Sequence, residues 1–310
     1  MSLPASPITS IHPNTITPVK HLAIYGNLSQ PSRRLNAIVN FFKLLDESDY
    51  RVTVERRFYD YLKALDGDMP RFDTFADECP ECDIAVSMGG DGTFLSTARA
   101  LGASGTPIVG VNTGHLGYLA DVDVADATRL LEALASGDYR EERRAVLQAS
   151  IVNGEGEIPA GEFALNEIAI LRAETASMIE VITAIDGEPL AHFRGDGLIV
   201  STPTGSTGYN LSVGGPIIEP SSPALSIAPI APHSLTMRPL VVADSTVIDI
   251  SVGSRVPSWR LSFDGHWVTL PINTRVQIKR APFTINIIHT AGHTFASTLR
   301  SKLLWGAASF

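Results

Sequence analysis

Cysteine and long hydrophobic runs are scarce in this sequence of 310 residues. Its two cysteines, Cys79 and Cys82, are too few for a framework of several disulfides. No run of about 18 apolar residues occurs, so we expect no transmembrane helix and no membrane partner. The first 20 residues lack the basic start and apolar stretch of a signal peptide. We therefore expect a cytoplasmic protein whose residues 1–20 form a flexible tail.

Positive charge is also limited. The chain has 24 Lys and Arg against 33 Asp and Glu, a formal net charge of -9. An acidic surface disfavours nucleic acid as a partner, although a local basic cleft can still hold phosphates. Hydrophobic residues make up 44% and charged residues 18% of the chain. This composition is typical of a folded globular protein and excludes extended disorder.

The two cysteines form a C-x-x-C motif, which occurs in redox pairs and in zinc sites. The nearest histidine pair that resembles a zinc motif, His289 and His293, is about 200 residues away, far outside zinc-finger spacing. Gly292 inside that pair also disfavours a helix. The sequence thus favours two reduced thiols in a loop, and we assign no metal-ligating residues.

Strand-like and helix-like patterns alternate in the first part of the chain. Residues 21–25 and 83–88 are short apolar runs typical of buried strands, and residues 33–45 have apolar positions at helical spacing. Residues 93–101 have helical spacing again, and Gly102 can end that helix. This alternation predicts a parallel, Rossmann-like sheet with helices on its faces.

From about residue 143 the chain is rich in β-forming segments. "VNGEGE" and "IDGEP" predict hairpin turns, and the prolines of "APIAPHSLTMRPL" predict loops. Residues 294–306 are helical in pattern. We therefore predict an α/β N-terminal domain and an all-β C-terminal domain. The expected ranges are 21–142 for the first, with 290–310 packing back on it, and 143–289 for the second.

A glycine loop follows the strand at 83–88. Gly89, Gly90 and Gly92 let the backbone approach a phosphate and take positive φ, and the free N–H groups of the next helix attract anions. The loop lacks the Gly-Lys-Ser/Thr ending of a Walker loop and the third glycine of the dinucleotide fingerprint. The simplest explanation of Asp91 within it is a helix cap.

A carboxylate beside phosphate-binding amides has a second explanation. Phosphoryl transfer needs a cation, usually Mg²⁺, and a residue that accepts or orients the hydroxyl proton. The loop therefore predicts a kinase in the broad sense. Residues 194–217 are mostly Gly, Ser, Thr and Pro, whose hydroxyls and exposed amides can bind a nucleoside, and Tyr209 can stack on a ring. A polar loop with a hairpin is the simpler explanation of that stretch.

These stretches together closely resemble the NAD kinase family. The matching motifs occur in order: "GGDGTFL" from Gly89, "LNEI", "DGLIVSTPTGSTGYNLSVGGPI" from Asp196, "APIAPHSLTMRPLVV" and "SFDGH". The resemblance runs from about residue 24 to 306 and includes "NTGHLGYLAD" and "LRSKLLWG". The glycine loop is shared with diacylglycerol, sphingosine and phosphofructokinases, whereas "STPTGST" is far more specific to NAD kinases.

The resemblance implies roles for individual residues. Asp91 would accept the proton of the adenosine 2′-hydroxyl of NAD. Asn166 and Glu167 would contact the adenosine, and Arg194 and Asp196 would lie near the nicotinamide or a neighbouring subunit. The expected substrate- and nucleotide-binding residues are Gly89, Gly90, Gly92, Thr93, Asn166, Glu167, Arg194, Asp196, Thr207, Gly208, Tyr209, Asn210, Leu211, Ser212 and His266.

The chain departs from the family at three positions. Many relatives have Ala in place of Gly208, Arg in place of Ser96 and Gln in place of His266. Ser96 in place of Arg removes a phosphate contact or leaves another residue to supply it. A structural or solvent-facing role explains His266 as well as ligand contact does.

The resemblance also implies a divalent cofactor and an oligomer. Mg²⁺ or another divalent metal would assist, ATP or polyphosphate would be the donor, and the protein would be a homodimer or homotetramer with NAD and ATP as ligands. Two alternatives remain. A lipid kinase would use the same glycine loop with an apolar pocket, and a dinucleotide sensor would bind without chemistry.

Overall fold

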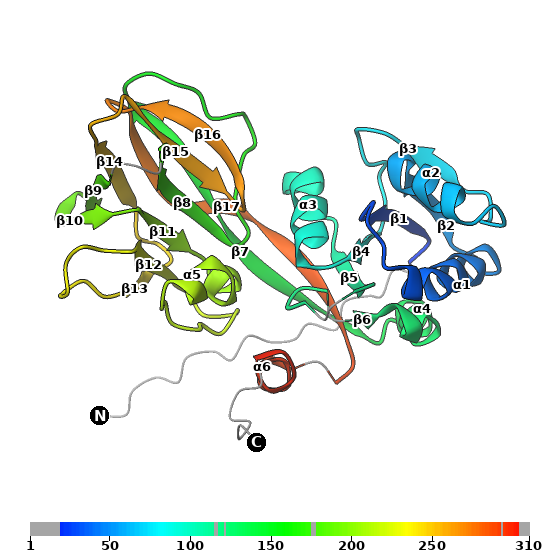
Figure 1. Ribbon diagram of the computed structural model, residues 1–310. Coiled ribbons are helices and arrows are strands. Elements are labelled where there is room, and N and C mark those ends of the chain that lie inside the picture. Colours follow the sequence, from blue (N-terminus) through cyan, green and yellow to red (C-terminus); the bar gives the residue numbers. More distant parts are fainter. Residues whose placement is uncertain (1–18, 115–116, 121, 175–177, 293, 304–310) are drawn as a thin grey trace, which may run out of the picture.

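The computed structural model of the protein describes residues 19–114, 117–120, 122–174, 178–292 and 294–303. An α/β part and a β part lie side by side, with the α/β part on the right of Figure 1. The predicted fold class is confirmed, because a parallel sheet with helices occupies the N-terminal part and antiparallel sheets occupy the C-terminal part.

The α/β part is built on parallel strands in the order β5-β4-β1-β2-β3, with β6 pairing with β5. Its strands are β1 (His21–Gly26), β2 (Arg51–Glu55), β3 (Asp73–Phe75), β4 (Ile84–Gly89), β5 (Ile108–Asn112) and β6 (Val122–Asp123). Its helices are η1 (Ser32–Arg34), α1 (Leu35–Asp46), α2 (Arg56–Leu65), α3 (Asp91–Leu101), η2 (Gly102–Ser104), η3 (Val124–Asp126) and α4 (Ala127–Ser136).

Side chains of β1 alternate between the two faces of this sheet. Leu22 and Ile24 belong to one core with residues of α1, whereas Ala23 belongs to a second core with Phe94 and Ala98 of α3. Helices thus cover both faces, which is why β4 and β5 are buried along their whole length.

The β part packs two sheets around one core. A six-stranded sheet has the order β13-β12-β11-β8-β15-β16, and β10, β9, β14 and β17 follow one another in the other. The strands are β7 (Tyr139–Asn153), β8 (Glu167–Arg172), β9 (Ile179–Ile185), β10 (Glu188–Gly195), β11 (Gly197–Ser201), β12 (Ala224–Ile230), β13 (Leu240–Ala243), β14 (Ile248–Gly253), β15 (Ser258–Phe263), β16 (His266–Pro271) and β17 (Arg275–Thr290). The helices are η4 (Thr204–Thr207), α5 (Tyr209–Ser212) and α6 (Phe295–Leu303).

Two long antiparallel strands connect the parts. β7 and β17 pair from Tyr139 with Thr290 to Asn153 with Arg275. Near its start β17 also pairs with β14, and near its end Ile287 pairs with β5. Residue 143, where we placed the start of the β-rich part, lies within β7. This strand pair therefore runs through both parts (Figure 1).

One of the two predicted hairpins is confirmed. Asp186 and Gly187, with φ of 49° and 83°, form the turn between antiparallel β9 and β10. The "VNGEGE" segment does not form a tight hairpin turn, because β7 pairs along its length with the distant β17. After this segment the chain returns to β7 only in one antiparallel bridge, between Leu147 and Ala164, before β8 begins.

The proline-rich segment is a loop only in part. Pro229 lies inside β12, opposite Leu198 of β11. The pairing of β12 with β13 ends at Ile227, so Pro229 lies at the edge of the sheet, where a missing N–H is tolerated.

The predicted C-terminal helix is present as α6. Ser297 and Ser301 of this helix line a small cavity together with Val122 and Leu130 of the α/β part, and the Lys302 ammonium lies 5.7 Å from the ring centroid of Tyr118. Residues 304–310 and His293 fall outside the described residues. No helix within the described ranges is long and apolar enough to cross a membrane.

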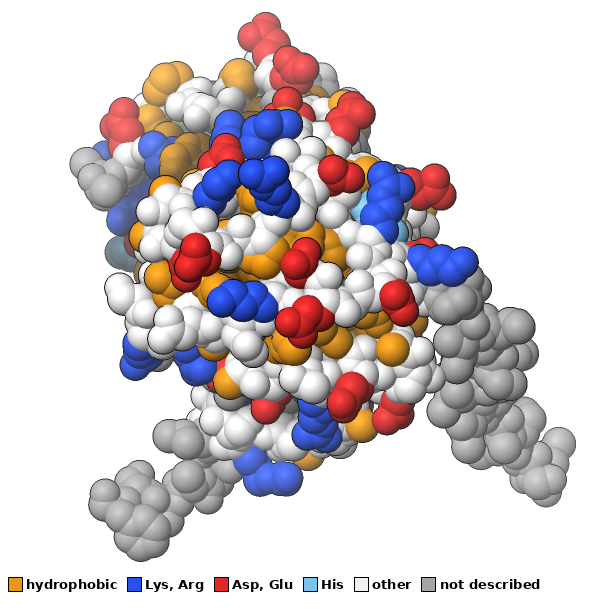
Figure 2. Space-filling view, turned by 90° about the vertical axis from the view of Figure 1, so that its right-hand side faces the viewer, with side chains coloured by type: hydrophobic (Ala, Val, Ile, Leu, Met, Phe, Trp, Pro, Cys, Tyr) orange, Lys and Arg blue, Asp and Glu red, His pale blue; other side chains and the backbone are white. Residues whose placement is uncertain are grey.

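The outer face of the α/β part mixes charges of both signs. Figure 2 shows Lys and Arg side chains interspersed with Asp and Glu on this face. It carries no broad basic surface of the kind that binds a nucleic acid backbone.

Candidate active site

The glycine loop joins β4 to α3, and its glycines provide space. Gly89, Gly90 and Gly92 do not have positive φ, so that part of the prediction is wrong. A Cβ on Gly89 would lie 2.1 Å from the Thr93 hydroxyl oxygen, so Gly89 lets α3 pack closely on β4. A Cβ on Gly90 or Gly92 would meet no atom within 4 Å, so these two glycines border open space.

Asp91 is the first residue of α3, and it does not cap the helix. Its Oδ2 accepts the backbone N–H of Tyr118 at 2.7 Å, and its Oδ1 accepts those of Leu119 at 2.8 Å and Ala120 at 3.3 Å. Gly117 permits this approach, because a Cβ there would lie 2.1 Å from Oδ1. The carboxylate thus holds the loop that follows β5.

A second aspartate, Asp264, works in the same way in the β part. Its carboxylate accepts the backbone N–H groups of Leu165 at 2.7 Å and of Asn166 and Glu167 at 2.9 Å each. Burial raises the pKa of Asp264 to about 6 despite these bonds. Sequence reasoning missed this residue, which lies in the β15–β16 turn and fixes the backbone of the predicted Asn-Glu pair.

Asn166 and Glu167 lie close to the predicted nucleotide-binding turn. β8 begins at Glu167, so Asn166 precedes the strand. A Cβ on Gly208 would lie 3.4 Å from Glu167 Oε2 and 3.5 Å from Asn166 Nδ2. That Oε2 atom is buried without a hydrogen-bond partner. Burial, helped by the charge of Asp264, raises the pKa of Glu167 to about 8.

The turn itself consists of η4 and α5. The Asn210 side chain is fully buried, donating to the carbonyls of Ser206 and Pro216 and accepting from Ser226. It fixes the turn instead of facing a ligand. Tyr209 is 40% exposed and free to meet a ring. Leu211 and Ser212 follow on α5.

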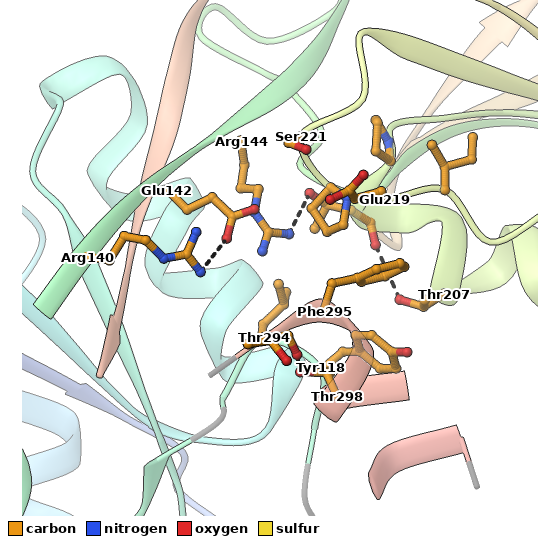
Figure 3. A pocket seen from close by; sticks show the side chains of 15 residues that line it. Tyr118, Arg140, Glu142, Arg144, Thr207, Glu219, Ser221, Thr294, Phe295 and Thr298 are labelled. Carbon is orange, nitrogen blue, oxygen red and sulfur yellow. Dashed lines mark hydrogen bonds and ion pairs between the residues drawn. The ribbon is translucent and has the colours of Figure 1, made fainter. Parts of the chain in front are cut away.

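A cavity of about 380 Å³ lies between the loop held by Asp91 and this turn (Figure 3). Tyr118 and Leu119 line it from the α/β part, Thr204 and Thr207 line it from η4, and Phe295 lines it from α6. Tyr118 and Leu119 also donate their backbone N–H groups to Asp91, so hydrogen bonds connect this wall of the cavity directly to the Asp91 carboxylate. Thr207 is the predicted binding residue that lines this cavity.

Charged side chains of β7 form another wall of the cavity, as Figure 3 shows. Arg140, Glu142 and Arg144 alternate along the strand and so share one face. Glu142 lies 3.2 Å from Arg144 Nε, 3.2 Å from His289 Nε2 and 3.6 Å from Arg140 Nη2. Arg144 Nη1 also donates to the Thr204 hydroxyl at 3.3 Å.

This arrangement determines the charge of Glu142. Burial alone would raise its pKa, but the hydrogen bond with His289 and the charge of Arg144 outweigh burial and lower the pKa to about 2. The glutamate is therefore ionised at neutral pH. Sequence reasoning missed this wall, although the alternation in "YREERR" is its signal.

Arg194, Asp196 and His266 are among the predicted residues that do not line the cavity. The Arg194 side chain is 71% exposed on β10, beside Glu180, and Asp196 pairs with Arg172 at 2.9 Å. His266 is exposed at the start of β16, two residues after Asp264.

The comparison with known proteins agrees with the resemblance noted in the sequence. Residues 35–139 match the model of the ATP-NAD kinase N-terminal domain, and residues 165–290 match that of the ATP-NAD kinase C-terminal domain. A Porphyromonas gingivalis protein named NAD kinase is 44% identical over 291 residues, which cover 94% of this chain and 99% of that protein. A Bacteroides fragilis NAD kinase is 42% identical over 93% of this chain and 98% of its own.

Solved structures show the same likeness. Yeast NADH kinase, solved with NADH, has a TM-score of 0.83 and 26% identity, covering 95% of this chain and 90% of its own. An NAD kinase from Archaeoglobus fulgidus, solved with ATP, has a TM-score of 0.68 and 26% identity, covering 90% of this chain and 98% of its own. With its fold, its motifs and relatives matched along nearly their whole length, the chain belongs to the NAD kinase family of phosphotransferases.

Proposed function

We propose that the protein transfers the γ-phosphoryl group of ATP to the adenosine 2′-hydroxyl of NAD, giving NADP and ADP. The supporting observation is the cavity between the loop held by Asp91 and the turn at Thr204–Thr207. The bond between the γ-phosphorus and its bridging oxygen breaks, and a bond from phosphorus to the 2′-oxygen forms. The hydroxyl proton leaves through Asp91.

Asp91 retains the capacity for this role. A carboxylate has about four acceptor positions, and backbone N–H groups use three of them, two on Oδ1 and one on Oδ2. The remaining position on Oδ2 can accept the ribose hydroxyl. In a loose phosphoryl-transfer transition state, orienting the nucleophile counts more than strong basicity.

The phosphates of ATP would lie at the glycine loop. Gly90 and Gly92 border open space, and the N-terminus of α3 presents free backbone N–H groups to an anion. Ser96 is uncharged, and its hydroxyl donates to the Gly92 carbonyl at 3.0 Å, so it supplies no cation there. Arg140, which lines the cavity and is half-exposed, is a cation that would meet a phosphate group extending into the cavity.

The nucleoside of NAD would lie on the β side. Asn166 offers an amide, and Glu167, neutral below about pH 8, offers a hydroxyl donor to a ribose or base. Thr207 and Tyr209 complete this side with a hydroxyl and a ring. Arg194, Asp196 and His266 would contact the nicotinamide end from another subunit of a homodimer or homotetramer.

A divalent cation would come with the nucleotide. The described residues contain no group of three or more His, Cys, Asp or Glu side chains that could hold a metal by themselves. Mg²⁺ usually keeps several waters and binds through substrate phosphates with only one or two carboxylates, and the one free acceptor position of Asp91 is assigned to the ribose hydroxyl. The residues therefore fit Mg²⁺ that would be held mainly by the phosphates of ATP, where it would neutralise their charge. ATP is our proposed donor, because a related NAD kinase was solved with ATP.

The direct test is to incubate the purified protein with Mg²⁺, ATP and NAD and to separate the products by chromatography. We expect NADP and ADP in equal amounts. The 3′-deoxy analogue of NAD should be phosphorylated, whereas the 2′-deoxy analogue should bind without turnover. Phosphate on the 2′-deoxy analogue at a comparable rate would show that another hydroxyl is the acceptor. Polyphosphate in place of ATP tests the donor.

A further inference from the structure

Cys79 and Cys82 lie outside the proposed site but in contact with each other. Both belong to the loop between β3 and β4, and their sulfur atoms are 3.9 Å apart. Each side chain is half-buried against the core that contains Phe94 of α3. Both residues are therefore partly exposed while the core beneath them holds them in place.

The surroundings make the two thiols unequal. Accepting a hydrogen bond from Cys82 lowers the pKa of Cys79 to about 7, and the Tyr25 hydroxyl next to it acts in the same direction. The same bond and burial raise the pKa of Cys82. Cys79 is thus the better nucleophile, and Cys82 keeps its proton.

A metal explanation has little support in the structure. Two sulfurs are half of a tetrahedral zinc set, and the described residues offer no cluster of three or more ligands. His21, the first residue of β1, already has partners for both ring nitrogens. His21 Nδ1 is 2.7 Å from the Glu81 carbonyl oxygen, and its Nε2 is 3.0 Å from the Thr53 hydroxyl.

We propose that Cys79 and Cys82 form a reversible dithiol–disulfide site that exchanges with small-molecule disulfides of the glutathione type. The Cys79 thiolate attacks a sulfur of the small disulfide, forms a mixed disulfide and releases one thiolate. Cys82 then loses its proton, attacks the Cys79 sulfur and releases the second thiolate. The protein loses two electrons and two protons, and the small disulfide becomes two thiols.

The geometry permits the internal bond. A disulfide has an S–S distance of about 2.05 Å, so the sulfurs must approach each other by about 1.9 Å. Residues 76–83 contain no helix or strand that would resist this movement. The end of the loop stays fixed, because the Asp83 carboxylate accepts the backbone N–H groups of Lys20 and His21 at 2.8 Å each.

The test uses the full-length protein in buffers of reduced and oxidised glutathione, without air. Samples are quenched with acid, alkylated and weighed by intact mass spectrometry. We expect a species that carries neither alkyl group nor glutathione and whose mass is 2 Da below that of the reduced, unalkylated chain. Treatment with dithiothreitol before alkylation should make both cysteines reactive again. Cys82→Ser should instead retain one glutathione on Cys79, because the resolving thiol is gone.

Two outcomes would overturn the proposal. One is full alkylation of both cysteines across all glutathione ratios. The other is glutathione on both cysteines without the lighter internal species. Kinase activity of reduced Cys79→Ser and Cys82→Ser should equal that of the reduced wild type, which shows that these variants are folded. Because the readout is mass, failure of this proposal is distinct from failure of the proposed kinase activity.

Discussion

At the scale of single residues, two aspartates organise the candidate site. Asp91 holds the backbone of residues 118–120, and Asp264 holds that of residues 165–167. Asp91 thereby fixes a segment that lines the cavity, and Asp264 fixes a segment beside the nucleotide-binding turn. Both aspartates lie in sequence motifs, but we expected a role only for Asp91 and not for Asp264 of "SFDGH", because the partners of Asp264 lie up to 99 residues away along the chain. Local patterns carry no information about such a pairing.

Glu167 supplies a residue-scale prediction. Its folded pKa of about 8 lies above the ordinary value of 4.5, so the unfolded chain releases this proton first. Stability should therefore fall as pH rises from about 4.5 to 8 and then level off. Glu167→Gln mimics the protonated acid and should raise the free energy of unfolding over wild type by on the order of 2 kcal/mol at pH 9, and by little at pH 4.

Urea unfolding at both pH values measures this difference. Glu157→Gln, at an exposed position, is the matched control and should stay within about 0.5 kcal/mol of wild type throughout. If Glu167→Gln ran parallel to wild type across this range, Glu167 would titrate as an ordinary exposed acid.

At the scale of elements, periodicity predicted several strands and helices correctly. Buried runs such as residues 83–88 and the helical spacing of residues 33–45 became β4 and α1, because local side-chain spacing decides which face is buried. The failures have a physical cause. "VNGEGE" contains turn-forming residues, yet β7 pairs with a strand more than a hundred residues later, and tertiary pairing overrode the local signal.

The glycine loop gives an element-scale prediction. Gly89→Ala should destabilise the protein by about 1–3 kcal/mol, because the new Cβ would overlap the Thr93 side chain on α3. Gly90→Ala meets no atom within 4 Å and should keep the thermal midpoint of the wild type. Its methyl group would occupy space proposed for ATP phosphate, so its KM for ATP should rise at least several-fold.

Thermal unfolding and steady-state kinetics of both variants separate the two effects. A Gly90→Ala enzyme with wild-type KM for ATP would place the phosphates elsewhere. A Gly89→Ala protein with unchanged stability would contradict the packing of α3 on β4 through this glycine.

At the scale of the whole molecule, the cavity is assembled from five segments of the chain. The loop at 117–120, the wall on β7, the η4 turn, residues 218–221 and the segment that begins α6 meet only in the folded chain. Composition and motifs predicted the two parts and their chemistry. They could not predict that Glu142, on one of the strands that run through both parts, joins Arg144 and His289 beside this cavity.

Glu142 gives a prediction at this scale. Its pKa is lowered to about 2 from an ordinary 4.5, so its contribution to stability is present above about pH 4.5 and is lost as pH falls toward 2. Glu142→Gln should reduce the free energy of unfolding by about 2–3 kcal/mol at pH 7. The difference from wild type should shrink steadily below pH 4.5.

The neighbouring Glu141→Gln is the control, since Glu141 is exposed on the same strand. Urea unfolding from pH 7 to pH 3 follows all three proteins. A loss for Glu142→Gln that persists unchanged at pH 3 would point to packing and not to charge.

The most direct measurement compares wild type and Asp91→Asn in NAD binding and in steady-state NADP formation across a Mg²⁺ series. Asn keeps the size of Asp but offers one acceptor oxygen, so it both removes the proton acceptor and weakens the hold on residues 118–120. Tyr118 and Leu119 line the cavity, so the Kd for NAD reports on that loop. We predict that kcat falls by about 10²–10⁴, that Kd stays within a few-fold, and that added Mg²⁺ restores nothing. Near-wild-type kcat, or a loss of NAD affinity as large as the loss of kcat, would reduce Asp91 to a residue that only holds the loop.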